Sequence, residues 1–124
     1  MINTKKIYNS LLNNENITAL VPEENIISAY PNEVTIYPSI FFLDENQADT
    51  EYYENKAGAS AASVQIHVFS KKLDGYVTTS EIGDKIAEVM NNDLWHCSKN
   101  GEVADPRPDV EHRVLIFSKS IFIN

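Results

Sequence analysis

The sequence has 124 residues, with 10 lysines and arginines against 18 aspartates and glutamates, so its formal charge at neutral pH is −8. This length is typical of one domain with one core, and a hydrophobic content of 43% excludes a chain that is disordered by composition. The negative net charge argues against a surface that binds nucleic acid, because such a surface needs clustered lysine and arginine side chains facing the phosphates.

The first predicted element is a helix that Asn3 or Thr4 can cap. One face of this helix carries an apolar stripe, formed by Ile7, Tyr8, Leu11 and Leu12. Residues 16–21 add a further helical turn, which Pro22 ends. A short strand is predicted over residues 25–30, before a turn at residues 31–32.

Residues 35–43 are rich in β-branched and aromatic side chains, which predicts a second strand. Pro38 cannot donate a ladder hydrogen bond, so the strand either begins after it or lies at a sheet edge. The polar, mostly acidic residues 44–57 predict a long hairpin loop. Residues 59–70 alternate with period two, which predicts a third strand with Val64, Ile66 and Val68 on one face.

A turn over residues 73–75 leads to the second predicted helix. Thr78 and Glu81 have the spacing of a capping box at its start. An apolar stripe follows, formed by Ile82, Ile86, Val89 and Met90, and residues 91–92 end the helix.

The last third of the chain predicts a hairpin. Its first arm covers residues 94–103, with either a tight turn or a bulge at Asn100-Gly101. The Asp-Pro-Arg-Pro-Asp run of residues 105–109 predicts a rigid corner, and residues 110–123 form the last strand. This order of elements predicts an α+β fold, with a mostly antiparallel sheet and two helices packed on it, in a single domain over residues 1–124.

Four residues could serve as metal ligands or as a catalytic pair: His67, His96, Cys97 and His112. Neighbours on a strand point to opposite faces, so His96 is not expected to act on Cys97. Zinc sites usually pair ligands two to four residues apart, and none of these residues is spaced so. A structural or surface role is favoured for all four, and a half-buried strand position beside Trp95 is favoured for Cys97.

Paired carboxylates occur at Asp44-Glu45, at Glu23-Glu24 and at Glu51 with Glu54. All of them lie in predicted loops, where acids are usually solvated rather than held for acid–base chemistry. The four glycines are isolated, so no phosphate-binding loop is present. We therefore expect a protein that is not an enzyme, with no catalytic residue, no metal and no cofactor.

The residue types that remain are those enriched in protein interfaces: Tyr52, Tyr53, Tyr76, Trp95 and Arg107. For Trp95, packing in the core is favoured over an interface. The run Glu51, Tyr52, Tyr53, Glu54 sets two tyrosines among acids, and a contact role there is as well supported as a solvated loop. The residues Ile121, Phe122 and Ile123 either complete the last strand or reach a neighbouring subunit.

The order of these segments resembles the tail completion, or tail-to-head joining, proteins of long-tailed phages and prophages. The resemblance covers most of the chain and rests on pattern and order. It is carried by a first helix ending near Leu20-Val21, the Tyr37-Pro38-Ser39-Ile40-Phe41-Phe42 strand, the Ser63-Val64-Gln65-Ile66-His67-Val68-Phe69 strand, the helix of residues 80–90, the corner at 105–109 and the strand of residues 113–117.

The resemblance implies a homo-oligomer, a hexameric ring on the head-proximal end of the tail, whose subunit can be a monomer in solution. Such a ring binds the tail tube protein on one side and the stopper protein of the head connector on the other. DNA passes through it without specific binding. The resemblance places the protein in the virion after assembly in the host cytoplasm. On this hypothesis, residues 44–57 and the C-terminal strand are the docking elements.

Other features bear on where the chain is made. The single cysteine excludes a disulfide within the chain, which fits a reducing cytoplasm. The sequence shows neither a signal peptide nor an apolar run near the ~20 residues of a membrane span, so we expect no membrane contact.

A competing interpretation is a stand-alone acidic binding module, such as an inhibitor or immunity protein that covers a basic enzyme surface. Ring formation separates the two, because an inhibitor has no need of it. An enzyme is a distant third interpretation, since the sequence predicts no pocket of convergent histidines or carboxylates.

Overall fold

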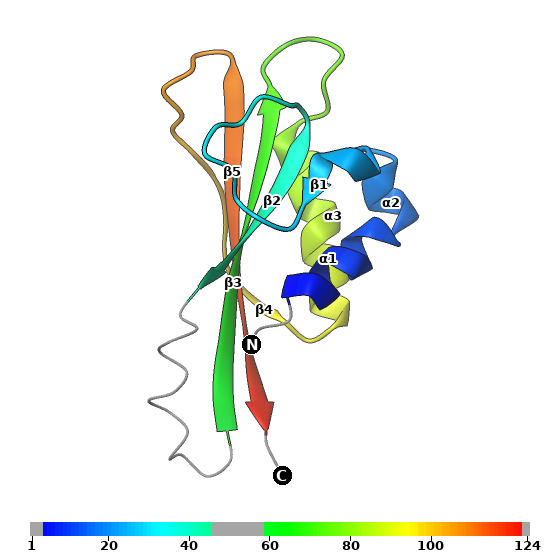
Figure 1. The fold of residues 1–124 in the computed structure, drawn as a ribbon, viewed down its shortest axis with the longest axis vertical. Helices are drawn as coiled ribbons and strands as arrows, with labels where there is room; N and C mark the ends of the chain where they lie inside the picture. The colour runs from blue at the N-terminus through cyan, green and yellow to red at the C-terminus, as the bar shows by residue number, and fades with distance from the viewer. Residues whose placement is uncertain (1–3, 46–58, 123–124) are drawn as a thin grey trace.

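The computed structural model describes residues 4–45 and 59–122. A five-stranded sheet in the order β1-β2-β3-β5-β4 carries helices on one face (Figure 1). The pair β1 and β2 is parallel and the other neighbours are antiparallel, which confirms the α+β class. In chain order the elements are α1 (Thr4–Leu12), α2 (Glu15–Thr18), the 3-10 turn η1 (Glu23–Asn25), β1 (Ile26–Ile27), β2 (Ser39–Glu45), β3 (Ala59–Lys71), α3 (Thr79–Asn92), β4 (His96–Val103) and β5 (Val110–Phe122).

Two helices form near the N-terminus, and the second covers Glu15–Thr18 where a helical turn over residues 16–21 was predicted. Ile7 and Leu11 of α1 are buried in the main core, which fixes the face that α1 turns to the sheet. Asn14 caps α2, because its side chain accepts hydrogen bonds from the backbone N–H groups of Asn16 (3.0 Å) and Ile17 (3.3 Å). Among the described residues, no helix is long and apolar enough to cross a membrane.

Two predictions near β1 and β2 are corrected. The strand expected over residues 25–30 has only two residues, because Asn25 belongs to η1 and the chain bends directly after Ile27. Asp44 and Glu45 were expected in the loop, but their backbone continues β2 through pairing with Val64 and Ser63 of β3. The start of β2 directly after Pro38 is confirmed.

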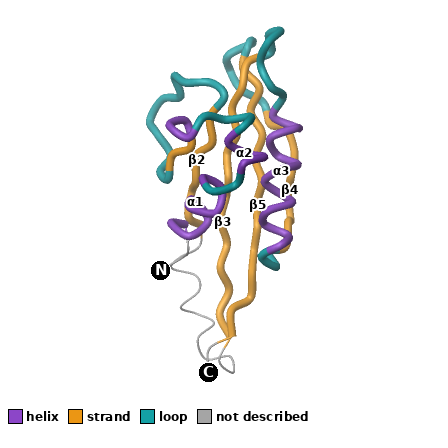
Figure 2. The backbone as a smooth tube through the Cα atoms, turned by 90° about the vertical axis from the view of Figure 1, so that its right-hand side faces the viewer, coloured by secondary structure: helices purple, strands orange, loops and turns teal. Residues whose placement is uncertain are grey.

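The two central strands, β3 and β5, are the longest. They pair over 13 residues each, from Ala59 with Phe122 to Lys71 with Val110. Their outer neighbours are shorter, since β2 pairs with residues 63–69 of β3 and β4 with residues 112–118 of β5. Residues 59–62 and 119–122 therefore project beyond the sheet as a two-stranded ribbon (Figures 1 and 2).

Helix α3 carries the chain from β3 to β4 across β5. The predicted cap is confirmed, because the Thr78 hydroxyl accepts a hydrogen bond from the Glu81 backbone N–H at 3.2 Å. The predicted stripe is confirmed as well: Ile82, Ile86 and Met90 are buried, and Val89 is packed against the same core.

The irregularity in β4 lies elsewhere than expected. Asn100 and Gly101 pair in regular register with Leu115 and Val114, so the turn or bulge predicted there is wrong. The register shifts between Cys97 and Lys99 instead. The side-chain oxygen of Asn100 also accepts a hydrogen bond from Arg113 Nη1 at 3.1 Å.

The sheet is buried on both faces. The main core lies between the helices and Ile40, Phe42, Val64, Ile66, Val68, Leu115 and Phe117 of the sheet. Trp95 belongs to it with 4% of its surface exposed, which confirms the core role that the sequence favoured. A second, smaller cluster on the opposite face is formed by Val34, Phe41, Phe69 and Val110, where the chain between β1 and β2 folds over the sheet (Figure 1).

Candidate functional site

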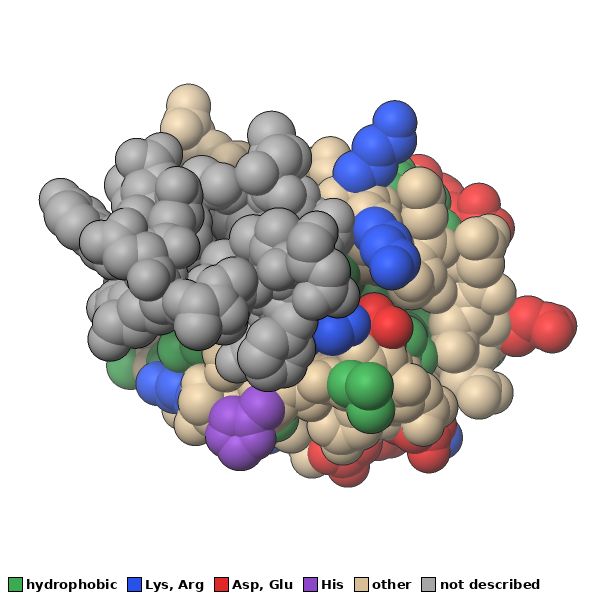
Figure 3. Space-filling view, turned by 90° about the horizontal axis from the view of Figure 1, so that it is seen from below, with side chains coloured by type: hydrophobic (Ala, Val, Ile, Leu, Met, Phe, Trp, Pro, Cys, Tyr) green, Lys and Arg blue, Asp and Glu red, His purple; other side chains and the backbone are tan. Residues whose placement is uncertain are grey.

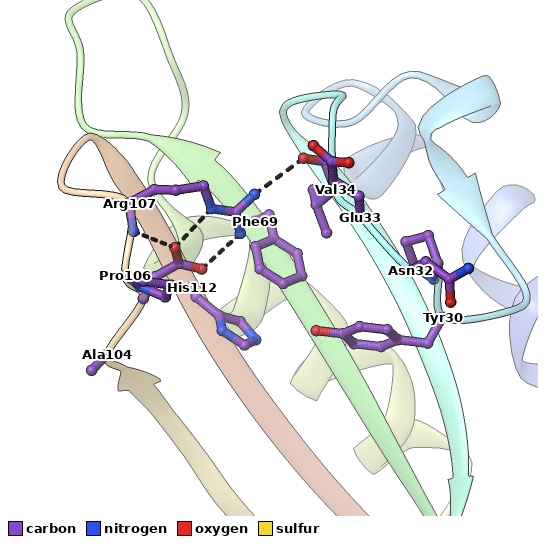
Figure 4. A pocket seen from close by; sticks show the side chains of 11 residues that line it. Tyr30, Asn32, Glu33, Val34, Phe69, Ala104, Pro106, Arg107 and His112 are labelled. Carbon is purple, nitrogen blue, oxygen red and sulfur yellow. Dashed lines mark hydrogen bonds and ion pairs between the residues drawn. The ribbon is translucent and has the colours of Figure 1, made fainter.

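A pocket of about 440 Å³ opens on the face of the sheet opposite the helices (Figure 4). Residues 30–34, between β1 and β2, form one wall, and residues 104–107, at the corner between β4 and β5, form the other. Phe69 of β3 and His112 of β5 line it between the walls. We call it the corner pocket. Its size falls in the range of about 300–1,000 Å³ typical of binding sites.

The corner wall is rigid because Arg107 folds back on Asp105. The Arg107 backbone N–H donates to Asp105 Oδ1 at 2.9 Å, which closes a tight turn over Pro106. The guanidinium adds two parallel bonds, from Nε to Oδ1 and from Nη2 to Oδ2, both 2.8 Å long. The predicted rigid corner is thus confirmed. Its stiffness comes from a bidentate ion pair as well as from the prolines.

Arg107 also connects the two walls of the corner pocket. Its Nη1 donates to the backbone oxygen of Val34 at 3.1 Å and to the hydroxyl of Tyr37 at 2.9 Å. The Tyr37 hydroxyl in turn donates to the Val34 oxygen at 3.2 Å. Arg107 was singled out in the sequence as an interface type of residue, and here it braces the fold.

The electrostatics of this pair keep both groups charged. The hydrogen bonds from Arg107 lower the pKa of Asp105 to about 2, although burial acts in the opposite direction. The Asp105 carboxylate raises the pKa of Arg107 further above its ordinary value. The side chain of Asp105 is only 4% exposed, so its charge depends on this partner.

A row of aromatic rings lines the sheet beneath the pocket. His112 stacks on Phe69, with ring centroids 4.1 Å apart. His112 Nε2 lies 2.9 Å from His67 Nδ1, and His67 Nε2 lies 2.8 Å from Gln65 Oε1. Burial lowers the pKa of His112. Both contacts are hydrogen bonds when His112 Nε2–H donates to His67 Nδ1 and His67 Nε2–H donates to Gln65 Oε1.

Tyr30 and Glu33 lie at the opening of the pocket. The Tyr30 ring meets the His67 ring edge to face at 4.7 Å, yet 40% of the residue remains exposed. Burial raises the pKa of Tyr30, and the charge of Asp105 raises it further. Glu33 is exposed, and within the described part of the chain its carboxylate forms no ion pair.

The predicted chemistry-bearing residues fall in different places. His67 and His112 come together, whereas His96 is exposed on β4 and the Cys97 thiol donates to the Lys99 backbone oxygen at 3.3 Å. Within residues 4–45 and 59–122, no three His, Cys, Asp or Glu side chains gather as a metal-binding group. Glu23 and Glu24 are exposed in η1, as expected of solvated acids.

The predicted contact residues are only partly within the described chain. Glu51, Tyr52, Tyr53, Glu54 and Ile123 lie outside it. The backbone of Ile121 and Phe122 completes β5, where these residues pair with Ser60 and Ala59. Their role in docking stays a prediction.

Sequence reasoning missed the corner pocket as a site. An aspartate two residues before an arginine, in a run broken by prolines, is a local signal for the turn at Asp105. The contacts of Arg107 with Val34 and Tyr37 join positions 73 and 70 residues apart. No short-range pattern encodes those contacts.

Comparison with known proteins gives a likeness of fold. No protein-family model matches the chain, and no curated protein matches its sequence. A solved chain from the virion of a native gene transfer agent particle is similar to it, with a TM-score of 0.72 and 16% sequence identity. The similarity covers 94% of this chain and 91% of that chain, and at this identity it concerns the fold.

Proposed function

We propose that this chain is a structural virion protein of a tailed phage or prophage, a ring subunit that joins the tail tube to the head connector by docking and not by catalysis. The observation that carries the proposal is the likeness to a chain of a gene transfer agent virion, which covers nearly the whole of both chains. The order of segments in the sequence independently resembles tail-to-head joining proteins.

A subunit placed between two other rings needs contact surfaces at its two opposite ends, besides the heterologous contacts that close its own ring. The molecule is elongated along β3 and β5, and different features mark its ends (Figure 1). The upper end in that view carries the turn after β3 and the corner of residues 104–109. The lower end carries the ribbon of residues 59–62 and 119–122.

We assign the lower end to one partner. A two-stranded ribbon is only marginally stable in water, so contact with another protein would stabilise it. Seen from this end, basic and acidic side chains are interspersed over the described surface (Figure 3), which offers no uniform field for a DNA backbone. On this proposal the docking residues are those predicted from the sequence: Glu51, Tyr52, Tyr53, Glu54, Ile121, Phe122 and Ile123.

In the assembled virion, the partners are further copies of this chain in a hexameric ring, the tail tube protein and the stopper protein of the head connector. DNA passes through the ring. The formal charge of −8 supports this role, because an acidic lumen repels the phosphates and lets DNA slide. The ring sits at the head-proximal end of the tail.

Negative-stain microscopy of the protein mixed with isolated phage tails tests the proposal. We expect a ring that caps one end of the tail tube and leaves the other bare. Absence of binding, together with a stable monomer in solution, would favour the acidic inhibitor or immunity protein instead.

Deletion of residues 51–54 tests the docking assignment. We expect the deletion to leave thermal unfolding nearly unchanged and to block head-to-tail joining, because the loop that the sequence predicts there would supply contacts while the sheet supplies the fold. The double variant Glu23→Gln, Glu24→Gln removes the same charge from the exposed η1 turn and serves as the control. A normal yield of infectious particles with the deletion would refute the assignment.

A further inference from the structure

The charges that line the corner pocket leave it net negative. Its lining includes the carboxylates of Glu33 and Asp105 and the guanidinium of Arg107, which sum to a formal charge of −1. All three guanidinium nitrogens of Arg107 already donate, to Asp105, Val34 and Tyr37. Glu33 therefore presents a carboxylate at the opening that no described cation balances.

The Asp105–Arg107 pair acts on two groups of the lining, and at both the effect of the carboxylate is the larger one. At the Tyr30 hydroxyl, Asp105 raises the pKa by more than Arg107 lowers it. The same order holds at His112, where Asp105 raises the pKa and Arg107 lowers it to a smaller extent. The carboxylate is thus felt more strongly than the guanidinium at two separate points of the lining, which favours a cationic occupant over an anionic one.

The walls suit a cation carried on an apolar stem. Tyr30 lies across the pocket from Pro106 and Ala104, with its hydroxyl directed toward His112 (Figure 4), and the face of an aromatic ring attracts a guanidinium or ammonium group. Lysine and arginine bury their methylene stems against apolar surface while the charged head meets a carboxylate. An acidic side chain would instead meet Glu33 and find four of the five N–H donors of the Arg107 side chain already engaged.

The surroundings of the pocket favour a protein over a small cation. The corner is tied to the turn after β3, because the Lys72 N–H donates to the Asp109 oxygen at 2.8 Å and Lys71 Nζ pairs with Asp109 at 2.8 Å. That turn exposes two large apolar side chains, Leu73 (56%) and Tyr76 (41%). Exposed apolar side chains at the same end as a polar pocket are typical of a protein interface.

We propose that the corner pocket receives an arginine or lysine side chain of the virion protein that docks at this end of the molecule. This inference rests on the proposed function, which it deepens by naming the chemistry of one contact. Tyr30 supplies the aromatic face and Glu33 the carboxylate, while Arg107 and Asp105 join the two walls.

A direct test titrates the full chain with the capped tripeptide Gly-Arg-Gly and follows its amide resonances by NMR. We expect saturable shifts centred on Glu33, Phe69 and His112, and none of similar size with capped Gly-Glu-Gly. Glu33→Gln should weaken the binding about threefold or more, whereas Glu24→Gln, an exposed acid in η1, should leave it unchanged. Tyr30→Phe should bind like the wild type, and Tyr30→Leu more weakly.

Equal binding of the two peptides, or shifts centred elsewhere, would overturn the inference. So would concentration-dependent shifts of the same residues without peptide, which would assign the pocket to a second copy of the chain.

The tail assay separates this inference from the proposed function. We expect Glu33→Arg to abolish binding of the protein to isolated tail tubes or to the head connector, whichever docks at this end. Glu24→Arg should leave binding to both partners intact. If Glu33→Arg assembles like the wild type on both sides, the pocket inference fails and the joining role stands. If the wild type itself does not assemble, the joining role fails, and the peptide titration still decides what the pocket binds.

Discussion

At the scale of single residues, Arg107 forms side-chain hydrogen bonds to residues 70 and 73 positions away in the sequence. It neutralises the Asp105 side chain, which is 4% exposed, and it binds the segment that contains Val34 and Tyr37. Loss of the guanidinium would leave the poorly solvated Asp105 carboxylate with only the Arg107 backbone N–H as a described donor, and the Val34 oxygen with only the Tyr37 hydroxyl. Unsatisfied groups of this kind cost about 1–3 kcal/mol, and more when charged.

We therefore expect Arg107→Gln to lower the free energy of unfolding by roughly 1–3 kcal/mol at pH 7, as measured by urea denaturation. Arg107→Lys should recover only part of this loss, because an ammonium cannot form the two parallel bonds to Asp105. Lys72→Gln removes an exposed charge at the same end and is the control. Equal stabilities of Arg107→Gln and Lys72→Gln would contradict the bracing role.

The pH dependence of stability follows from Asp105. Its pKa falls from 3.8 to about 2 on folding, so the folded state binds a proton less readily than the unfolded chain. The stabilisation is complete above pH 3.8 and is lost as the pH falls from 3.8 to 2. Urea denaturation at pH 5 and at pH 2.5 should show a smaller acid loss for Arg107→Gln than for the wild type. An unchanged acid loss would show that Arg107 is not the cause.

At the scale of elements, the end of α3 contains a strained position. Leu94 has φ of 67°, a left-handed conformation that is usually occupied by glycine. The backbone there forms both closing bonds of a helix end, from Leu94 N–H to the Asn91 oxygen and from Trp95 N–H to the Met90 oxygen, each 3.0 Å long. The Leu94 side chain is 81% exposed, so little packing compensates for the strain.

Leu94→Gly is therefore expected to raise the free energy of unfolding by up to about 1 kcal/mol, because relief of the left-handed strain exceeds the entropy that glycine adds to the unfolded chain. Leu73→Gly, at a comparably exposed position without a positive φ, should not stabilise the protein. Thermal unfolding of both variants measures the difference. A loss of stability in Leu94→Gly would show that this side chain contributes through contacts.

The contact between α3 and the sheet depends on a buried glycine. A Cβ at Gly83 would lie 2.9 Å from Arg113 Cδ and 3.3 Å from Asn100 Oδ1. Arg113 cannot give way freely, because its Nη1 donates to Asn100 Oδ1 at 3.1 Å and its Nε to Thr79 Oγ1 at 3.4 Å. Gly83 thus lets the helix approach the strands that carry these side chains.

A double-mutant cycle tests this packing. Gly83→Ala should lower the free energy of unfolding, although alanine is the better helix former by about 1 kcal/mol. In an Arg113→Ala background the closest obstruction, Arg113 Cδ, is gone and Asn100 Oδ1 is released from its bond to Arg113, so the same substitution should raise stability. A stabilising Gly83→Ala in the wild-type background would mean that the Arg113 side chain adapts without cost.

At the scale of the whole molecule, the ribbon at the lower end is separate from the core. The core residues of β5, Leu115 and Phe117, precede residues 119–122, whose pairing within the described chain is with residues 59–62 of β3 alone. Lys119 lies over the Trp95 ring at 5.5 Å and pairs with Asp93 at 3.6 Å, so it marks where the domain proper ends. The fold and the proposed docking end can therefore be separated by truncation.

We expect a chain that ends at Lys119 to unfold cooperatively, with a midpoint close to that of the full chain, and to lose tail capping. Circular dichroism and microscopy with isolated tails measure the two properties. A chain that ends at Val114 loses Leu115 and Phe117 and should not fold, which provides the opposite control. If the chain that ends at Lys119 caps tails as well as the full chain does, the ribbon is not part of the contact with the partner.

Local signals in the sequence determined much of the fold. The cap at Thr78, the stripe of α3, the alternation in β3 and the start of β2 after Pro38 all appear where short-range chemistry places them. Each depends on an interaction within a few residues: a side chain that caps a helix, a period of 3.6 or 2, or a missing N–H group.

Tertiary structure alone decided the corner pocket, the shift in β4 and the length of β1. The pocket needs Arg107 to meet Val34 across 73 residues, and His67 to meet His112 across 45. The β4 shift lies at Cys97, because register follows from how the strand pairs with β5 and not from the turn-forming Asn100-Gly101 pair. Contacts of this kind arise only when the whole sheet and its cover have assembled, so no local pattern of residues can encode them.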